Sequence, residues 1–69
     1  SWSSVRESVL MDGVNVGRNT VVSRAILDKY VSVEEGAMVG IDSEHDRERG
    51  FTVTESGITV VAKGQVVTR

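Results

Sequence analysis

Two consecutive segments of this chain align with each other without a gap, at a period of 17 residues. They are residues 5–21 (VRESVLMDGVNVGRNTV) and residues 22–38 (VSRAILDKYVSVEEGAM). Aliphatic residues recur through both copies at intervals of five, six and six residues, at Val5, Leu10, Val16, Val22, Leu27, Val33 and Val39. At 3.6 residues per turn this spacing would not place the aliphatic residues on one face of an α-helix. It suits a solenoid, whose successive turns bury their apolar faces against one another. The sequence therefore predicts an all-β fold, a parallel β-helix of hexapeptide repeats with about two coils.

Each short strand of the repeat has an inward and an outward face, because successive side chains of a strand point to opposite sides. The bends between strands carry residues typical of turns, as at Asp12-Gly13, Gly17-Arg18-Asn19 and Glu35-Gly36. In the interior we expect aliphatic columns one period apart, with Leu10 on Leu27, Val16 on Val33 and Val22 on Val39.

The outward positions are apolar on two of the three expected faces. Polar residues, Asn15 and Ser32, occupy the third face. Isolated aliphatic residues are common on protein surfaces, and valine has a high propensity for β-strands. Stacked apolar pairs, however, are typical of surfaces that dock another domain or subunit. The interface candidates are Val9 with Ile26, and Val21 with Met38.

The aliphatic repeat ends at Val39, and the chain then changes character. We expect residues 1–40 to form the coils, residues 41–50 a charged loop or short helix, and residues 51–69 a C-terminal hairpin and tail. Ser43, three residues before Asp46, suits the N-cap of a short helix. Two strand-like runs flank Ser56-Gly57 and predict a β-hairpin that caps the last coil, with Phe51 as its apolar plug.

Composition excludes several classes of function. A net charge of −2 with scattered basic residues does not provide the basic surface that nucleic acid requires. No apolar run is long enough for a signal peptide or a membrane span, so we expect a cytoplasmic location. A chain of 69 residues without cysteine is small for an independent core, which predicts help from a partner.

No catalytic or metal-binding constellation can be argued from the residues. His45 is the only histidine and falls in the charged segment outside the coils, where a solvated side chain is expected. An EF-hand starting at Asp42 is excluded because Arg47 stands where that loop needs glycine. We therefore predict no catalytic residue, no cofactor and no metal ligand within these 69 residues.

Basic side chains are the remaining candidates for a binding site. Guanidinium and ammonium groups that converge can hold phosphate through charge-assisted hydrogen bonds. The cations that could do so are Arg24, Lys29, Arg47, Arg49 and Lys63, although neighbouring acidic residues could also neutralise them. Among these we place Lys29, Lys63 and Arg24 as the candidates for an allosteric phosphate site.

Three segments resemble the C-terminal end of the bacterial glucose-1-phosphate adenylyltransferase family, and the likeness covers about residues 5–63. They are AILDK (25–29), VGIDSEHDRERGF (39–51) and ESGITVV (55–61). The coil pattern alone would be shared with many sugar nucleotidyltransferases and acyltransferases. The acidic and basic segment after the last coil is what narrows the resemblance.

The resemblance implies a left-handed parallel β-helix, attached in the whole enzyme to an N-terminal nucleotidyltransferase domain that is absent from these residues. It further implies an enzyme that makes ADP-glucose from ATP and glucose 1-phosphate with Mg²⁺, in glycogen synthesis. Partners implied are the catalytic domain of the same chain, other subunits of a homotetramer, and a sugar-phosphate or nucleotide effector. Lys29 and Lys63 match basic positions of the family's activator sites, and the sequence around Gly64 departs from relatives that continue as a helix.

Two other interpretations stay open beside a regulatory and assembly domain. One is a purely structural β-helix assembly module, which the apolar outward faces favour. The other is the same domain of a nucleotidyltransferase with a different sugar or base. An acyltransferase fragment is disfavoured, because it would need more coils and a histidine on a coil.

Overall fold

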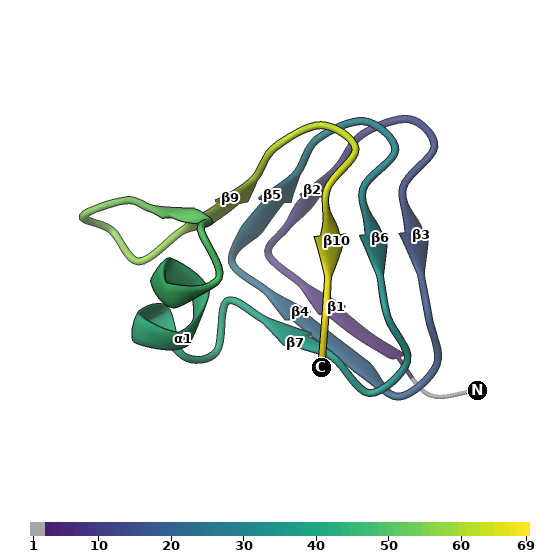
Figure 1. Ribbon diagram of the computed structural model, residues 1–69, viewed down its shortest axis with the longest axis horizontal. Coiled ribbons are helices and arrows are strands. Elements are labelled where there is room, and N and C mark those ends of the chain that lie inside the picture. The colour runs from purple at the N-terminus through teal and green to yellow at the C-terminus, as the bar shows by residue number, and fades with distance from the viewer. Residues whose placement is uncertain (1–2) are drawn as a thin grey trace.

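The structure, a computed structural model, describes residues 3–69. Successive turns of this part of the chain follow the same triangular path (Figure 1). The elements in chain order are β1 (Ser3–Arg6), β2 (Val9–Leu10), β3 (Asn15–Val16), β4 (Thr20–Ser23), β5 (Ala25–Leu27), β6 (Ser32–Val33), β7 (Met38–Val39), α1 (Ser43–Glu48), β8 (Thr52–Val53), β9 (Thr59–Val61) and β10 (Val66–Val67).

Three sheets form the walls of this triangular solenoid, which we call the prism. Their strand orders are β1-β4-β7, β3-β6-β10 and β2-β5-β9-β8, and all of these neighbours are parallel except β8 and β9. Each strand therefore lies beside the strand that occupies the same place in the next turn. The predicted fold, mostly strands in a repeating parallel arrangement with one short helix in the described range, is confirmed at this level.

The register of the sheets follows the repeat of the sequence. Each pair of opposed residues among the first seven strands lies one period apart, as the alignment of residues 5–21 with 22–38 predicts. The three expected interior pairs are all present, with Leu10 opposite Leu27, Val16 opposite Val33 and Val22 opposite Val39.

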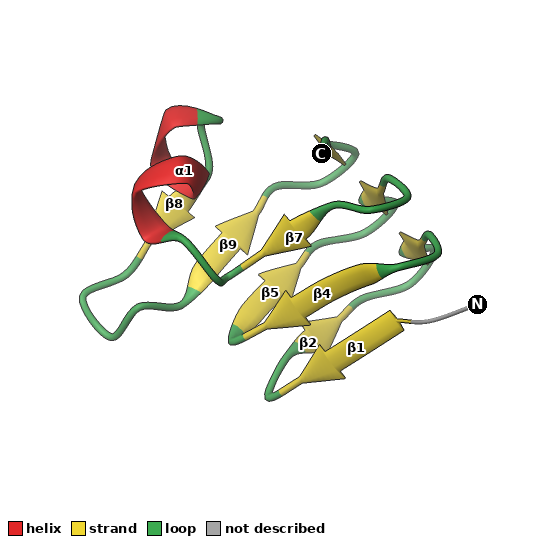
Figure 2. Cartoon of the chain, turned by 90° about the horizontal axis from the view of Figure 1, so that it is seen from below, coloured by secondary structure: helices red, strands yellow, loops and turns green. Residues whose placement is uncertain are grey.

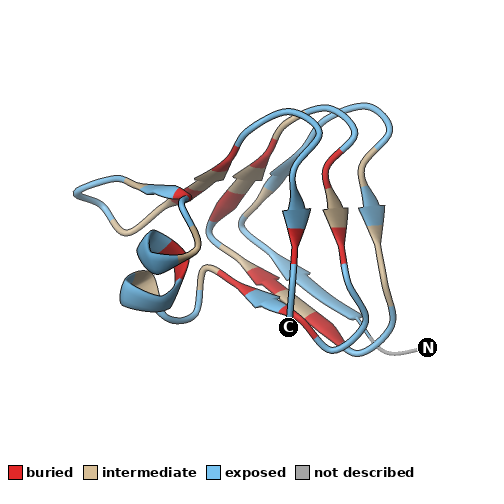
Figure 3. Ribbon diagram, viewed as in Figure 1, coloured by how far each residue is buried: buried red, intermediate tan, exposed pale blue. Residues whose placement is uncertain are grey.

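The interior is a core of mainly aliphatic side chains. Buried residues recur in all three walls of the prism (Figure 3). Val22, Leu27 and Val39 have no exposed surface. The interior residues of the first turn differ, since Val5 is 43% and Leu10 is 39% exposed. Within residues 3–69 no further turn lies on their other side, so this end of the core is open.

Between β7 and β9 the chain leaves the prism and returns (Figure 2). We call this segment the excursion. The excursion contains α1 and then β8, which pairs in antiparallel fashion with β9 through Thr52 opposite Val60 and Val53 opposite Thr59. The hairpin predicted around Ser56-Gly57 is therefore present. Phe51, at the start of the hairpin, is 7% exposed and belongs to the main core.

The final segment differs from the expected hairpin and tail. β9 also pairs in parallel with β5, and β10 pairs in parallel with β6, so both strands extend walls of the prism. The physical reason is visible in residues 59–67 (TVVAKGQVV), which repeat the alternation of residues 25–33 (AILDKYVSV). Because Val61 and Val67 fall at inward positions, returning to the prism buries both completely.

The short helix α1 is present where the charged segment predicted it, but Ser43 is not its N-cap. Asp42 is the N-cap, and its side chain accepts hydrogen bonds from the Glu44 and His45 amides at 3.1 and 3.2 Å. The expected partner in the capping box, Asp46, points inward instead, where it accepts other hydrogen bonds.

Candidate functional site

The structure brings Lys29 and Lys63 to the same corner of the prism. Lys29 lies in the turn between β5 and β6, and Lys63 lies in the equivalent turn between β9 and β10. The Gly64 amide donates to the Lys29 carbonyl oxygen at 2.9 Å, and the Tyr30 amide donates to the Asp12 carbonyl oxygen at 3.0 Å. Asp12, Lys29 and Lys63 therefore follow one another in register, at a strand-to-strand spacing of about 4.8 Å. We call this group of stacked turns the lysine corner.

The two lysines of this corner have exposed side chains, and neither forms an ion pair within residues 3–69. Within residues 3–69, the one ion pair joins Arg49 to Asp46, away from the lysine corner. The nearest carboxylate in sequence, that of Asp28, accepts a hydrogen bond from the Lys29 amide at 2.7 Å, which braces the turn. Two ammonium groups on neighbouring turns are a suitable arrangement for one phosphate group.

The structure places Arg24 at a different corner from the two lysines. It precedes β5, whereas Lys29 follows that strand. Its Nη2 donates to the Ser56 carbonyl oxygen at 2.6 Å, and its own carbonyl oxygen accepts from the Thr59 amide at 3.1 Å. These contacts join the excursion to the prism, so Arg24 does not converge with Lys29 and Lys63.

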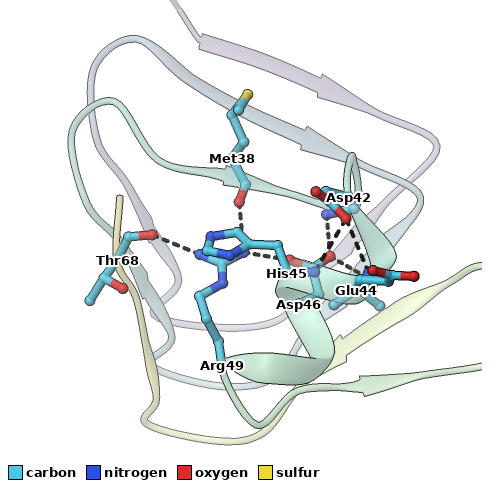
Figure 4. Close-up of polar contacts among 9 residues, drawn as sticks. Met38, Asp42, Glu44, His45, Asp46, Arg49 and Thr68 are labelled. Atoms are coloured by element: carbon cyan, nitrogen blue, oxygen red, sulfur yellow. Dashed lines mark hydrogen bonds and ion pairs between the residues drawn. The ribbon is translucent and has the colours of Figure 1, made fainter.

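Arg49, the second cation of the charged segment, is committed to a structural junction. Its guanidinium forms an ion pair with Asp46, and it donates to the Thr68 carbonyl oxygen at 2.7 Å and to the Met38 carbonyl oxygen at 2.8 Å (Figure 4). The Phe51 ring lies beneath it, 5.0 Å from the guanidinium carbon to the ring centroid. Arg49 is therefore unavailable to a ligand, whereas Arg47 is exposed on α1.

Asp46 completes this junction from the buried side. Its side chain is 1% exposed, and Oδ2 accepts from the Gly40 amide at 2.9 Å and from the Thr59 hydroxyl at 2.8 Å. Asp46 and Arg49 thus connect α1 to β7, to β9 and to the segment after β10. From the sequence, Asp46 was expected to take part in the helix cap and Arg49 was one of the candidate phosphate-binding cations. Their spacing of one helical turn was the signal that could have predicted the ion pair.

His45 is an exposed residue of α1. Its backbone amide donates to Asp42, and no hydrogen bond of its imidazole is found within residues 3–69. The position of the side chain therefore offers no partner for acid–base chemistry in this part of the chain.

The predicted interface residues lie on two outward faces. Val9 and Ile26 are opposed on the β2-β5-β9 wall, and Val60 continues their row. Val21 and Met38 are opposed on the β1-β4-β7 wall, where Met38 is 52% exposed. We call these the two apolar rows, and no described segment of the chain covers them fully.

Other features of the described range offer no chemistry of their own. A shallow hollow of about 220 Å³ is lined by Ser3, Ser4, Asn19, Thr20 and Val21, none of which titrates near neutrality. The one described helix is too short and too polar to cross a membrane. Magnesium, which the resemblance assigns to nucleotidyl transfer, has no fitting ligand set here, because no three His, Cys, Asp or Glu side chains of residues 3–69 gather around one point.

The chain is similar in sequence to proteins named glucose-1-phosphate adenylyltransferase. It is 62% identical over 65 residues to a glucose-1-phosphate adenylyltransferase of Arthrobacter sp. (strain FB24), which covers 94% of this chain and 14% of that protein. The protein of the same name from Bifidobacterium adolescentis is 61% identical over 67 residues, covering 97% of this chain and 16% of the relative. The Cutibacterium acnes protein is 56% identical over 66 residues, covering 96% and 16%.

The chain thus matches the C-terminal region of these relatives and spans only about a sixth of their length. The recognition made from AILDK and VGIDSEHDRERGF is confirmed. A family model described as GlmU-like, C-terminal hexapeptide, matches residues 1–61. This match covers most of the chain and agrees with the three parallel walls, so the chain belongs to the GlmU-like, C-terminal hexapeptide family.

Proposed function

We propose that this chain is the regulatory and assembly domain of an enzyme that makes ADP-glucose from ATP and glucose 1-phosphate in glycogen synthesis. The similarity to glucose-1-phosphate adenylyltransferases over 91–97% of the chain supports this context. In this proposal the domain is a left-handed β-helix, it is not catalytic, and Mg²⁺ serves the catalytic domain elsewhere in the protein. The whole enzyme is a cytoplasmic homotetramer.

The regulatory part of the proposal is supported by one observation, the stacking of Lys29 and Lys63 at one corner. Both side chains are exposed, and neither forms an ion pair within residues 3–69. A sugar phosphate or nucleotide effector would place a phosphate against both ammonium groups. Arg24, which is held by Ser56 at another corner, would act on the effector only indirectly, through the position of the excursion.

The test uses the full-length protein with Lys29→Ala, Lys63→Ala and the double substitution. We expect each single variant to need more effector for half-maximal activation, and the double variant to lose most of the response, while activity without effector is unchanged. Arg18→Ala is the matched control, since Arg18 is an exposed cation at another corner of the prism. Activation of the double variant equal to that of the unsubstituted enzyme would contradict a regulatory role for the corner.

Assembly is supported by the two apolar rows. The rows are continuous along the stacked turns and lie on different walls, so they could contact two different neighbours. If the double lysine variant is regulated normally while substitutions in the rows alter the oligomer, the domain is a structural assembly module. That outcome would separate the two roles.

A further inference from the structure

Tyr30 occupies a backbone position that glycine fills in the neighbouring turns. In the stacked corners, Gly13 precedes Tyr30 and Gly64 follows it, with φ values of 74°, 62° and 75° respectively. A bulky residue at positive φ costs about 1–2 kcal/mol relative to its ordinary conformations. Glycine would avoid this cost, so the contacts of the Tyr30 side chain are of interest.

The Tyr30 ring lies against the backbone of Gly13. A Cβ atom added to Gly13 would lie 2.4 Å from Cδ1 and 2.7 Å from Cε1 of the ring, so a side chain there would displace the ring from this position. Gly13 therefore lets the ring settle on the preceding turn. On the side of the following turn, Lys63 Nζ lies over the ring at 6.0 Å from its centroid.

We propose that Tyr30 is a positioning residue of the lysine corner, which holds the Lys63 ammonium beside that of Lys29. This inference rests on the proposed anion site. The negative face of an aromatic ring attracts an ammonium group, and the attraction restricts a side chain that otherwise has many rotamers. A restrained lysine loses less conformational entropy when it binds an anion, so the corner is arranged for the ligand in advance.

The charged groups that surround the corner are consistent with this role. Asp28 is engaged with the Lys29 amide, and Asp12 lies on the far side of Lys29 from Lys63 in the stack. The ring is the one partner of the Lys63 ammonium found within residues 3–69. Tyr30 is itself 61% exposed, so a ligand can approach the ring and both lysines from solvent.

The experiment uses the full-length protein with Tyr30→Gly and Tyr30→Phe. Tyr30→Gly removes the ring and suits the positive φ, so the turn should fold as those at Gly13 and Gly64 do. Tyr30→Phe keeps the aromatic face. Calorimetry measures the Kd for inorganic phosphate, and mass spectrometry after reductive methylation measures the labelling rate of Lys63 relative to Lys29.

We expect Tyr30→Gly to raise the Kd for phosphate about two- to fivefold and to raise the relative labelling of Lys63 by a similar factor. Tyr30→Phe should retain the original values of both. Unchanged Lys63 labelling in Tyr30→Gly, or tighter phosphate binding, would overturn the positioning role.

Failure of the anion site itself gives a different result. If Lys29→Ala and Lys63→Ala do not weaken phosphate binding, the proposed site is wrong, and with it the role of Tyr30 in ligand binding. If both lysine substitutions weaken phosphate binding while Tyr30→Gly changes neither readout, the site stands and the positioning role is wrong.

Discussion

At the scale of single residues, Asp46 has the most demanding environment in the molecule. It is the one charged residue of the described range that is buried, and its carboxylate joins three partners from different elements. Its main charged partner, Arg49, has a side chain that is 11% exposed. Removing one member of a buried ion pair leaves the other charge without compensation, which costs about 3–5 kcal/mol.

Asp46→Ala should therefore loosen the junction between α1 and the prism. We expect amide hydrogen exchange in Gly40 and β9 to accelerate about 100- to 4,000-fold, as a local loss of about 3–5 kcal/mol implies. Exchange measured by mass spectrometry on the full-length protein checks this. Glu48→Ala, an exposed acidic position on the same helix, is the control. Equal protection in both variants would show that the ion pair contributes little.

Gly40 is a second residue on which the junction depends, because it combines positive φ with close packing. Its φ is 84°, and an added Cβ would lie 1.7 Å from the Ser23 carbonyl oxygen. Gly64 also has positive φ, at 75°, but an added Cβ there would meet no atom within 4 Å.

Gly40→Ala and Gly64→Ala thus separate steric overlap from backbone strain. We expect Gly64→Ala to cost about 1–2 kcal/mol and Gly40→Ala about 3 kcal/mol or more, since backbone displacement is added to strain. Thermal unfolding of the two full-length variants, followed by hydrogen exchange of β4 and β7, provides the comparison. Similar losses for the two substitutions would mean that the backbone around Ser23 adapts easily.

At the scale of elements, the N-cap of α1 is Asp42 and not the predicted Ser43, because other groups compete for the Asp46 side chain. The sequence is compatible with a capping box at the helix N-terminus, formed by Ser43 and Asp46. The Gly40 amide and the Thr59 hydroxyl bind Asp46 inside the molecule, so Asp42 accepts from the first free amides of the helix. The N-cap position therefore depends on β9, which is remote in sequence.

Asp42→Ala and Ser43→Ala test this assignment directly. Loss of an N-cap carboxylate costs about 1 kcal/mol, so Asp42→Ala should speed exchange of the Glu44 and His45 amides about fivefold. Ser43→Ala should change exchange by much less, because no hydrogen bond to the Ser43 side chain is found within residues 3–69. The opposite order of effects would restore Ser43 as the cap.

At the scale of the whole molecule, the two apolar rows determine how the prism can meet its neighbours. Met38 is 52% and Val9 is 54% exposed, although both lie in regular strands. Ser32 occupies the corresponding outward position of the third wall. The rows therefore differ in chemistry from that wall but not in backbone geometry.

Ile26→Ser and Met38→Ser should shift the full-length protein toward smaller assemblies or lower its solubility, whereas Ser32→Ala should not. The reason is that serine removes apolar surface that a subunit contact would bury. Light scattering coupled to size-exclusion chromatography measures the assembly state. The same small change in all three variants would remove the rows as interfaces.

The sequence by itself determined the repeat, the register and the interior columns. Residues 17 apart must occupy equivalent places when an aliphatic residue returns every five or six positions, so Leu10 on Leu27 follows from local spacing alone. The β8-β9 hairpin and the presence of α1 were equally local, since turn and helix signals lie within a few residues. The sequence also supplied Lys29, Lys63 and Arg24 as separate candidates.

Only the tertiary structure decided which of these residues meet. The return of β9 and β10 to the prism joins segments separated by the whole excursion, and that return alone brings Lys63 into register with Lys29. The same return makes Thr59 a partner for Asp46 and sends Arg24 to Ser56. Sequence spacing cannot specify these contacts, because they depend on which buried partner satisfies each polar group once the third turn is stacked.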